Sequence, residues 1–419
     1  MAPRSKTLDE LRTFSGFALV GLANTVLPAI IHAANYLIIP YPRAVVTLIE
    51  TLPAIAVKLC LPFFIHRLPC RLRPLLVSVC WLVARKVAND TPPNVLPPVR
   101  VTMSVLASVS AAVTEVSCLG MIGHSGPQAV VGWGFGTGAG MLCNAVWPYV
   151  LTHRVGRLLR SATGGIYHLL AVFLLAHFLV LPQRLTKTEL LHRQERGRGD
   201  EERRAFIECG RARSASPRSG RAKFEVLRGL IRSELLPMFV ASALLFLQQG
   251  AVRTLDGPFF ATFSRFAATH GVSLHLGTLV SRSSIRFYPG RNSNLVLAAL
   301  GAVTTLVFVN AVLLVSTHFA LLLSFTTGVL SGLVYINILA RIVQEVRHES
   351  DGEFSLGVVT AGDAGGVLVG GVLGTVIALH EFSTTTSSAT VEAVGPSMPR
   401  IPIVALFGKF NDEPVFNQH

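Results

Sequence analysis

The chain has 419 residues, of which 51% are hydrophobic and only 14% are charged, and its mean hydropathy is +0.53. Soluble globular domains carry about 25% charged residues, so this composition excludes an ordinary soluble protein. The apolar blocks are continuous and long, which favours an all-α polytopic membrane protein over a barrel of alternating strands. The net charge of +14 comes from Lys and Arg concentrated between the apolar blocks. That is the pattern of cytoplasmic loops, so we expect membrane lipids, not nucleic acid, as partners.

Eleven apolar blocks are candidate membrane spans. The third is short, and the eighth is short unless it starts earlier, in FATFSRFAATH at 260–270. In order the eleven blocks cover about residues 14–39, 44–66, 74–85, 101–122, 130–152, 164–182, 234–255, 271–280, 293–315, 319–343 and 354–379. The expected organisation is a cytoplasmic N-terminus (1–13), a six-helix half (14–182), a basic loop (183–233), a five-helix half (234–380) and a luminal polar tail (381–419). With the N-terminus inside, the inner segments hold 25 Lys and Arg and the outer segments 11, which favours this orientation.

The second block contains two opposite charges, Glu50 and Lys58. They are eight residues apart, so they lie on roughly the same side of a helix but about 12 Å apart along it. They cannot pair closely with each other, and each needs a partner elsewhere, which a solute could supply. The alternative is that Lys58 extends toward the basic loop 67–73.

The third block reaches Arg85 and Lys86 after only a few turns, so it is short or tilted, or these two side chains extend to the interface. A Pro-rich stretch up to residue 100 follows it. Asn89 and Thr91 form the only N-x-S/T sequon in the chain. Asn89 is therefore a candidate glycosylation site in an expected luminal loop.

The fourth block carries Glu115, and the fifth carries the run GWGFGTGAG at 132–140. No strand precedes this run and no Lys-Ser/Thr follows it, so it lacks the context of a nucleotide-binding loop. Gly136 and Gly138 instead predict close helix packing or a bent helix that lines a pathway.

The stretch 183–233 contains 14 Lys or Arg and 7 Asp or Glu and few aromatic residues. Such a composition favours disorder, although the end of this stretch, residues 222–233, is a candidate for a short amphipathic helix on the membrane surface. Its position divides the spans into six and five, which is the layout of transporters built from two six-span halves with the last span missing.

The last two blocks combine small and polar residues at membrane depth. The first contains Gly332, Tyr335 and Asn337, and the second contains Asp363 among six glycines. A carboxylate at this depth usually faces a protein interior or a water-filled cavity, which favours a solute pathway. The alternative is helix packing at Gly365 and Gly366, with Asp363 satisfied by a backbone group or a neighbouring hydroxyl.

Catalytic and metal-binding patterns are missing from the sequence. The six cysteines include no CxxC, the histidines include no HExxH, and no Ser-His-Asp set stands out. We therefore expect no metal, no cofactor and no enzymatic activity.

Four stretches, in order along the chain, resemble the battenin family of lysosomal and vacuolar membrane proteins. The first two are LIETLPAIAVKLCLP at 48–62, and SAAVTEVSCLGMI at 110–122 with VVGWGFGTGAG at 130–140. The others are SRSSIR at 281–286, and SGLVYIN at 331–337 with EFSLGVVTAGDAGG at 353–366. The sequence departs from the family pattern at Leu244, before Gln248 and Gln249, and at Leu274 and His275.

The resemblance implies a major-facilitator-like bundle of about eleven spans in the membrane of an acidic organelle. It also implies clearance of glycerophosphodiesters from the lumen, with links to luminal pH and basic amino-acid levels. The residues Ser281, Arg282, Ser283 and Ser284 would form a cytoplasmic motif of the family.

Two functions remain open on the sequence. In a secondary transporter, Glu50, Lys58, Glu115 and Asp363 would line a cavity between the halves. Lys58 would hold a phosphodiester, a carboxylate would carry a coupling proton, and hydroxyl groups of the solute would bond to Gln249, Tyr335 and Asn337. In a non-transporting scaffold, the loop 183–233 would instead recruit trafficking partners or anionic lipids.

Overall fold

The computed structural model describes residues 3–36, 43–65, 72–90, 97–125, 127–151, 166–181, 227–254, 260–284, 293–313, 316–345 and 349–392. Across these ranges the chain forms 11 helices and no strand, which confirms the all-α prediction. The chain divides into two compact units, Met1–Ala378 and Leu379–His419, and the helical bundle belongs to the first.

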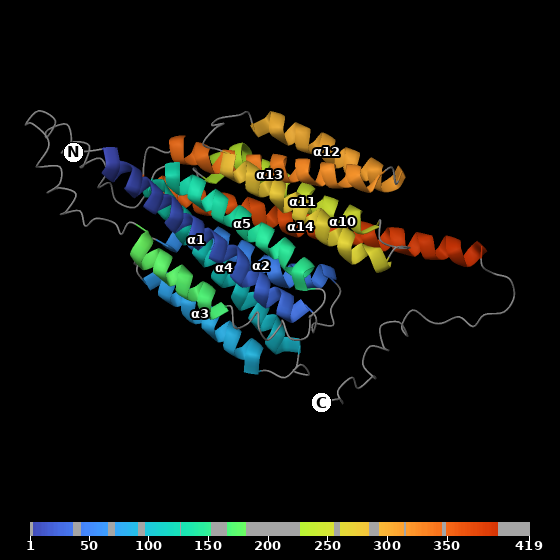
Figure 1. The fold of residues 1–419 in the computed structure, drawn as a ribbon, viewed down its shortest axis with the longest axis horizontal. Helices are drawn as coiled ribbons and strands as arrows, with labels where there is room; N and C mark the ends of the chain where they lie inside the picture. The colour runs from blue at the N-terminus through green and yellow to red at the C-terminus, as the bar shows by residue number, and fades with distance from the viewer. Residues whose placement is uncertain are drawn as a thin grey trace, which may run out of the picture. The chain divides into compact units, whose positions relative to one another are not determined.

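The first half of the bundle contains six helical segments, coloured from blue to green in Figure 1. They are α1 (Pro3–Tyr36), α2 (Arg43–Phe64), α3 (Leu72–Asp90), α4 (Pro97–Ser125), α5 (Pro127–Leu151) and the segment Ile166–Val180, which ends in the π-helical turn η2 (Ala176–Val180).

The second half begins with a helix that starts at Leu227 and contains the π-helical turn η3 (Ile231–Leu235). It continues with α10 (Leu236–Thr254), α11 (Phe260–Ser283), α12 (Ser293–Leu313), α13 (Thr317–Glu345) and α14 (Glu349–Glu392). The first helical residues thus lie inside the stretch 183–233 expected as loop, and the rest of that stretch is outside the described ranges.

Eight of the described helices are long and apolar enough to cross a membrane, so the protein is a multi-pass membrane protein. Leucines and valines remain exposed along the outer helices, for example Leu75, Leu76 and Val79 on α3 and Leu306 and Val309 on α12. Such apolar surface suits a bundle that faces lipid hydrocarbon.

The glycine run of α5 packs this helix against two neighbours. Added Cβ atoms at Gly132 and Gly136 would overlap backbone atoms of α1, whereas one at Gly138 would lie 3.0 Å from Leu279 Cα of α11. Glycines four residues apart share one face of a helix, so α5 presents one glycine face to α1 and another to α11. Close helix packing, the first explanation offered for this run, is confirmed by these contacts.

A second set of glycines joins α14 to the helix that contains η3 and α10. A Cβ at Gly362 would lie 2.6 Å from the Leu235 carbonyl oxygen, and Cβ atoms at Gly366 and Gly370 would overlap the next carbonyls along this helix. The regular four-residue spacing holds the two backbones in contact over three turns.

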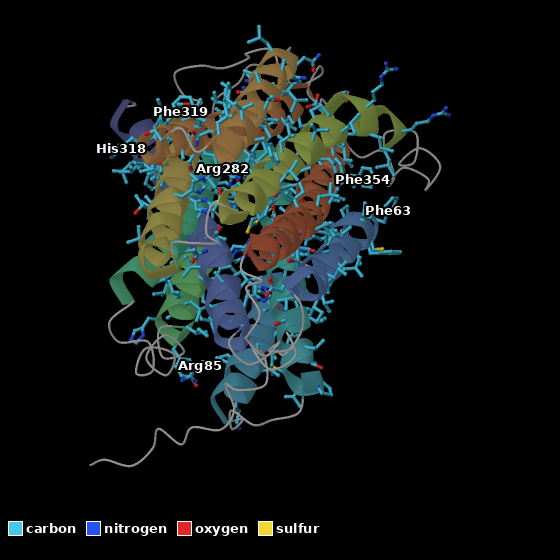
Figure 2. All side chains as sticks on the ribbon, turned by 90° about the vertical axis from the view of Figure 1, so that its right-hand side faces the viewer. Phe63, Arg85, Arg282, His318, Phe319 and Phe354 are labelled. Atoms are coloured by element: carbon cyan, nitrogen blue, oxygen red, sulfur yellow. The ribbon has the colours of Figure 1, made fainter. Side chains whose placement is uncertain are left out.

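The two halves meet through α5 with α11, and through α2 with α14. Phe63 of α2 and Phe354 of α14 pack edge to face with ring centroids 5.0 Å apart (Figure 2). One turn further along, a Cβ at Gly357 would lie 3.0 Å from the ring of Pro62. The two halves of the bundle are thus in direct contact through aromatic and proline side chains of α2.

The end of the third helix differs from the sequence expectation. The helix continues beyond residue 85 to Asp90, so Asn89 lies in its last turn. The guanidinium of Arg85 packs on the ring of Tyr167 in the segment Ile166–Val180, with its Cζ 3.3 Å from the ring centroid. Arg85 therefore has a cation–π partner on another helix.

Candidate functional site

Lys58 and Glu115 form a buried ion pair inside the first half. The Lys58 Nζ lies 2.8 Å from Glu115 Oε2, and the two side chains are only 7% and 14% exposed. Lys58 Nζ also lies 3.4 Å from the carbonyl oxygen of Thr360 in α14. The prediction that Lys58 needs a partner outside its own helix is therefore confirmed, and the side chain is buried within the bundle.

Glu50, the other charged side chain named on α2, makes a separate contact. Its Oε1 is 3.4 Å from Nδ1 of His32 on α1, and the other ring nitrogen of His32 is 3.4 Å from the Ser108 hydroxyl on α4. Glu50 and Lys58 thus have different partners, as their spacing predicted. These contacts connect α1, α2 and α4 through polar side chains within the apolar bundle.

Asp363 accepts a hydrogen bond of 2.5 Å from the hydroxyl of Ser242 on α10. Its carboxylate is half-buried, and no cation of the described ranges lies within ion-pairing distance of it. Gly362 and Gly366 hold the neighbouring turns of α14 against the same helix. A hydroxyl partner was one of the two alternatives for this carboxylate, and the small residues around it serve packing.

Arg282 lies at the end of α11 in a contact that joins three helices (Figure 2). Its Nη1 donates a hydrogen bond of 2.9 Å to Thr137 Oγ1 of α5, and its Cζ lies 3.9 Å from the centroid of the Tyr335 ring of α13. The Trp133 indole N–H of α5 in turn donates to the Tyr335 hydroxyl at 3.1 Å. Side chains of α5 therefore contact side chains of α11 and α13 across the boundary between the halves.

The remaining motif residues of α11 have local roles. The Ser281 hydroxyl bonds to the Thr278 carbonyl, and the Ser283 and Ser284 hydroxyls likewise bond to carbonyls of their own helix. Ser281 is buried against Gly332 of α13. The Ser281 hydroxyl also lies 3.5 Å from the Gly328 carbonyl of α13. The motif therefore packs within the bundle, and Arg282 is its member with contacts to side chains of two other helices.

Of the three residues expected to bond solute hydroxyls, only Tyr335 lies in this cluster. Gln249 is half-buried on α10, next to Gln248, whose amide donates to Thr304 on α12 at 2.7 Å. Asn337 is 5% exposed, and neither its amide nitrogen nor its amide oxygen has a hydrogen-bond partner. A buried amide without partners is unusual and leaves Asn337 able to bond a ligand.

The candidate residues fall into separate groups of contacts within the bundle. Lys58 pairs with Glu115, Asp363 bonds to Ser242, and Arg282 lies against Tyr335 and Thr137. Glu50 belongs to the His32 contact. No hydrogen bond or ion pair within the described ranges joins Gln249 to any of these groups.

Several residues that form the polar contacts of the candidate site were not predicted from the sequence, for different reasons. Thr137 and Trp133 lie within the glycine run but were not singled out, because hydroxyls and indoles are common in membrane helices. Ser242 and Thr360 gave no signal at all, since they contribute one hydroxyl and one backbone carbonyl. A further ion pair, Arg341 Nη1 to Glu234 Oε1 at 3.1 Å, was also missed.

Comparison with known proteins decides the family. The model of the CLN3 protein family matches residues 15–381. The chain belongs to this family. The match includes residues of all eleven helices and confirms the resemblance to battenin drawn from the four sequence stretches.

Fungal members of the family are similar over nearly their whole length. The chain is 29% identical to Protein btn-1 of Neurospora crassa, with 87% of each chain covered. It is 30% identical to Protein btn1 of Aspergillus fumigatus, with 86% of each covered. Protein BTN1 of Yarrowia lipolytica is 28% identical, with 86% of this chain and 92% of the relative covered.

Proposed function

We propose that the protein is a secondary transporter that moves a small polar solute, such as a glycerophosphodiester, across the membrane of a lysosome, vacuole or similar acidic organelle. The observation that carries this proposal is the polar boundary between the halves. Lys58 of the first half meets Thr360 of the second, and Arg282 of the second meets Thr137 of the first. Buried charges in a membrane are costly and typically mark solute or ion pathways.

The solute class is inferred from the charged and neutral polar side chains buried in the bundle, together with the family resemblance. A glycerophosphodiester carries one negative charge and several hydroxyls, so its site needs a cation and neutral hydrogen-bonding groups. Lys58 and Arg282 supply cations, and Tyr335 and the unpartnered amide of Asn337 supply neutral groups. Gln249 and Glu50 would take part farther along the pathway.

Proton coupling is proposed to act through Glu115 or Asp363. Protonation of Glu115 would break its ion pair with Lys58, and protonation of Asp363 would remove the charge that accepts the Ser242 hydrogen bond. Either event changes the charge within the bundle and can drive a change between conformations. Effects on luminal pH and on basic amino-acid levels would follow from such coupling.

Flux in proteoliposomes tests the proposal. Purified protein is reconstituted, and uptake or export of a labelled glycerophosphodiester is measured with and without an inside-acid pH gradient. Gradient-sensitive flux that disappears in Lys58→Ala is the expected result. Folded protein that produces no flux under either condition would contradict the proposal.

The coupling proton is tested separately with Glu115→Gln and Asp363→Asn. Each neutral variant keeps the shape of the side chain but cannot exchange a proton, so at least one should flatten the pH dependence of flux. Unchanged pH dependence in both variants would remove these carboxylates from the coupling.

Trafficking partners of the loop 183–233 remain a proposal, because most of this loop lies outside the described residues. Its many Lys and Arg suit anionic lipids. If the protein is a transporter, a variant that lacks residues 183–226 should keep most of the solute flux of the unchanged protein. If flux persists while the cellular role is lost, the loop has a recruiting role in addition to transport.

A further inference from the structure

Arg282 is a buried cation without a carboxylate. It is 6% exposed, and no Asp or Glu of the described ranges lies within ion-pairing distance of it. Lys58 and Arg341, in contrast, each contact a carboxylate at 2.8 Å and 3.1 Å. Removing an arginine from water without a counter-charge is costly, so its position in the bundle calls for an explanation.

The groups that hold Arg282 are neutral and leave hydrogen-bonding capacity unused. Thr137 accepts one bond and the Tyr335 ring lies under the guanidinium, while the Arg282 Nε–H has no acceptor. A guanidinium offers five N–H donors in a planar fork that matches the two oxygens of a phosphate or carboxylate. The free donor and the missing counter-charge both point to an anion.

We propose that Arg282 is the anion subsite of the pathway and binds a singly charged oxyanion, a phosphodiester or a carboxylate, over the Tyr335 ring. This inference rests on the proposed transport function and deepens it. The charge of Lys58 is already matched by Glu115, so the uncompensated charge that attracts the solute is that of Arg282.

Binding at Arg282 also affects the boundary between the halves. Its hydrogen bond to Thr137 connects α11 to α5, and a Cβ at Gly134 would lie 2.8 Å from the Arg282 carbonyl oxygen, so the two helices are in close contact here. An incoming oxyanion competes with the Thr137 hydroxyl for the guanidinium. Solute binding thereby removes one polar contact that holds the halves together.

Equilibrium binding to the full-length protein in lipid nanodiscs tests the inference without requiring flux. The probes are glycerophosphoglycerol as the phosphodiester, glycerate as the carboxylate and glycerol as the neutral control. The unchanged protein should bind one or both anions and not glycerol. Arg282→Gln should weaken anion binding by about 30-fold or more, since a buried charged contact is lost.

Further variants separate an anion subsite from a structural role. Arg228→Gln, which changes an exposed arginine, is the matched control and should bind as the unchanged protein does. Arg282→Lys keeps the charge without the planar fork and should retain part of the affinity. Thr137→Val removes the competing hydroxyl and should tighten anion binding, a gain that a purely structural role of Arg282 would not produce.

The outcomes distinguish this inference from the transport proposal. If folded Arg282→Gln binds anions as tightly as the unchanged protein, or if the unchanged protein binds neither anion, the subsite is refuted even where flux is observed. If Arg282→Gln does not fold, the other two variants decide. The subsite is then refuted if Arg282→Lys binds anions as tightly as the unchanged protein and Thr137→Val binds them no more tightly. Binding that depends on Arg282 without any flux would instead refute transport and leave the subsite standing.

Discussion

The close contact between α14 and α10 leads to a graded prediction for three glycine-to-alanine substitutions. A Cβ at Gly366 would overlap the Phe239 carbonyl oxygen and lie 2.8 Å from Ser242 Cβ and 2.9 Å from the Ala243 nitrogen. A Cβ at Gly365 would meet only the Phe239 ring, at 3.2 Å and 3.4 Å. At Gly301 in α12 a Cβ would meet nothing within 4 Å.

The magnitude follows from comparing these sites. Replacing glycine by alanine within a helix stabilises the helix by up to about 1 kcal/mol. This contribution is the same for the three variants and cancels when their stabilities are compared. At Gly366 the obstructing atoms belong to the backbone or to a Cβ, so the helices must move apart by roughly 1 Å to restore ordinary contact. Overpacking of this kind costs about 1–3 kcal/mol. Gly366→Ala should therefore be less stable than Gly301→Ala by that amount, with Gly365→Ala between them.

Thermal unfolding of the purified variants in one detergent is the assay. The unfolding midpoint should fall in the order Gly301→Ala, Gly365→Ala, Gly366→Ala, with a few degrees between the extremes. A Gly366→Ala protein that unfolds at the temperature of Gly301→Ala or above would refute the tight contact between α14 and α10.

Two further predictions concern charged side chains. Lys58→Met or Glu115→Gln alone leaves a buried charge without its partner and should lower the free energy of unfolding by about 3–5 kcal/mol. The double variant should be destabilised by less than the sum of the two single variants. A double-mutant cycle on the unfolding midpoint in which the two destabilisations add would contradict the ion pair. Arg85→Gln should cost at most about 1 kcal/mol, the value of a partly exposed cation–π contact with Tyr167, and Tyr167→Leu should remove any further effect of Arg85→Gln in the same assay.

The all-α membrane fold was predictable because its signal is local. A run of about 20 apolar residues must form a helix in a bilayer, where every backbone group has to be hydrogen-bonded within the segment. The weakest predictions were the ends of helices. The third helix continues past Arg85 to Asp90, and the partner of Arg85 in it is Tyr167, which is far away in sequence and so could not be predicted from the third helix alone.

The partners of the buried charges were predictable in kind but not in identity. The eight-residue separation of Glu50 and Lys58 required partners on other helices, and the structure supplies His32 and Glu115. Which helices lie side by side is a tertiary property. No pattern within α2 could therefore have pointed to Glu115 rather than Asp363 as the partner of Lys58.

The glycine run of α5 was interpreted as either close packing or part of a pathway, and the structure connects the two. Gly134 lets the backbone of α11 approach at Arg282. Thr137 lies three residues further on, on nearly the same face of α5, and so its hydroxyl meets the Arg282 guanidinium. With a larger residue at 134, α11 would be displaced and this bond would lengthen. Close packing of α5 and α11 therefore makes the Arg282–Thr137 bond between the halves possible. The packing and pathway interpretations of the glycine run describe one arrangement.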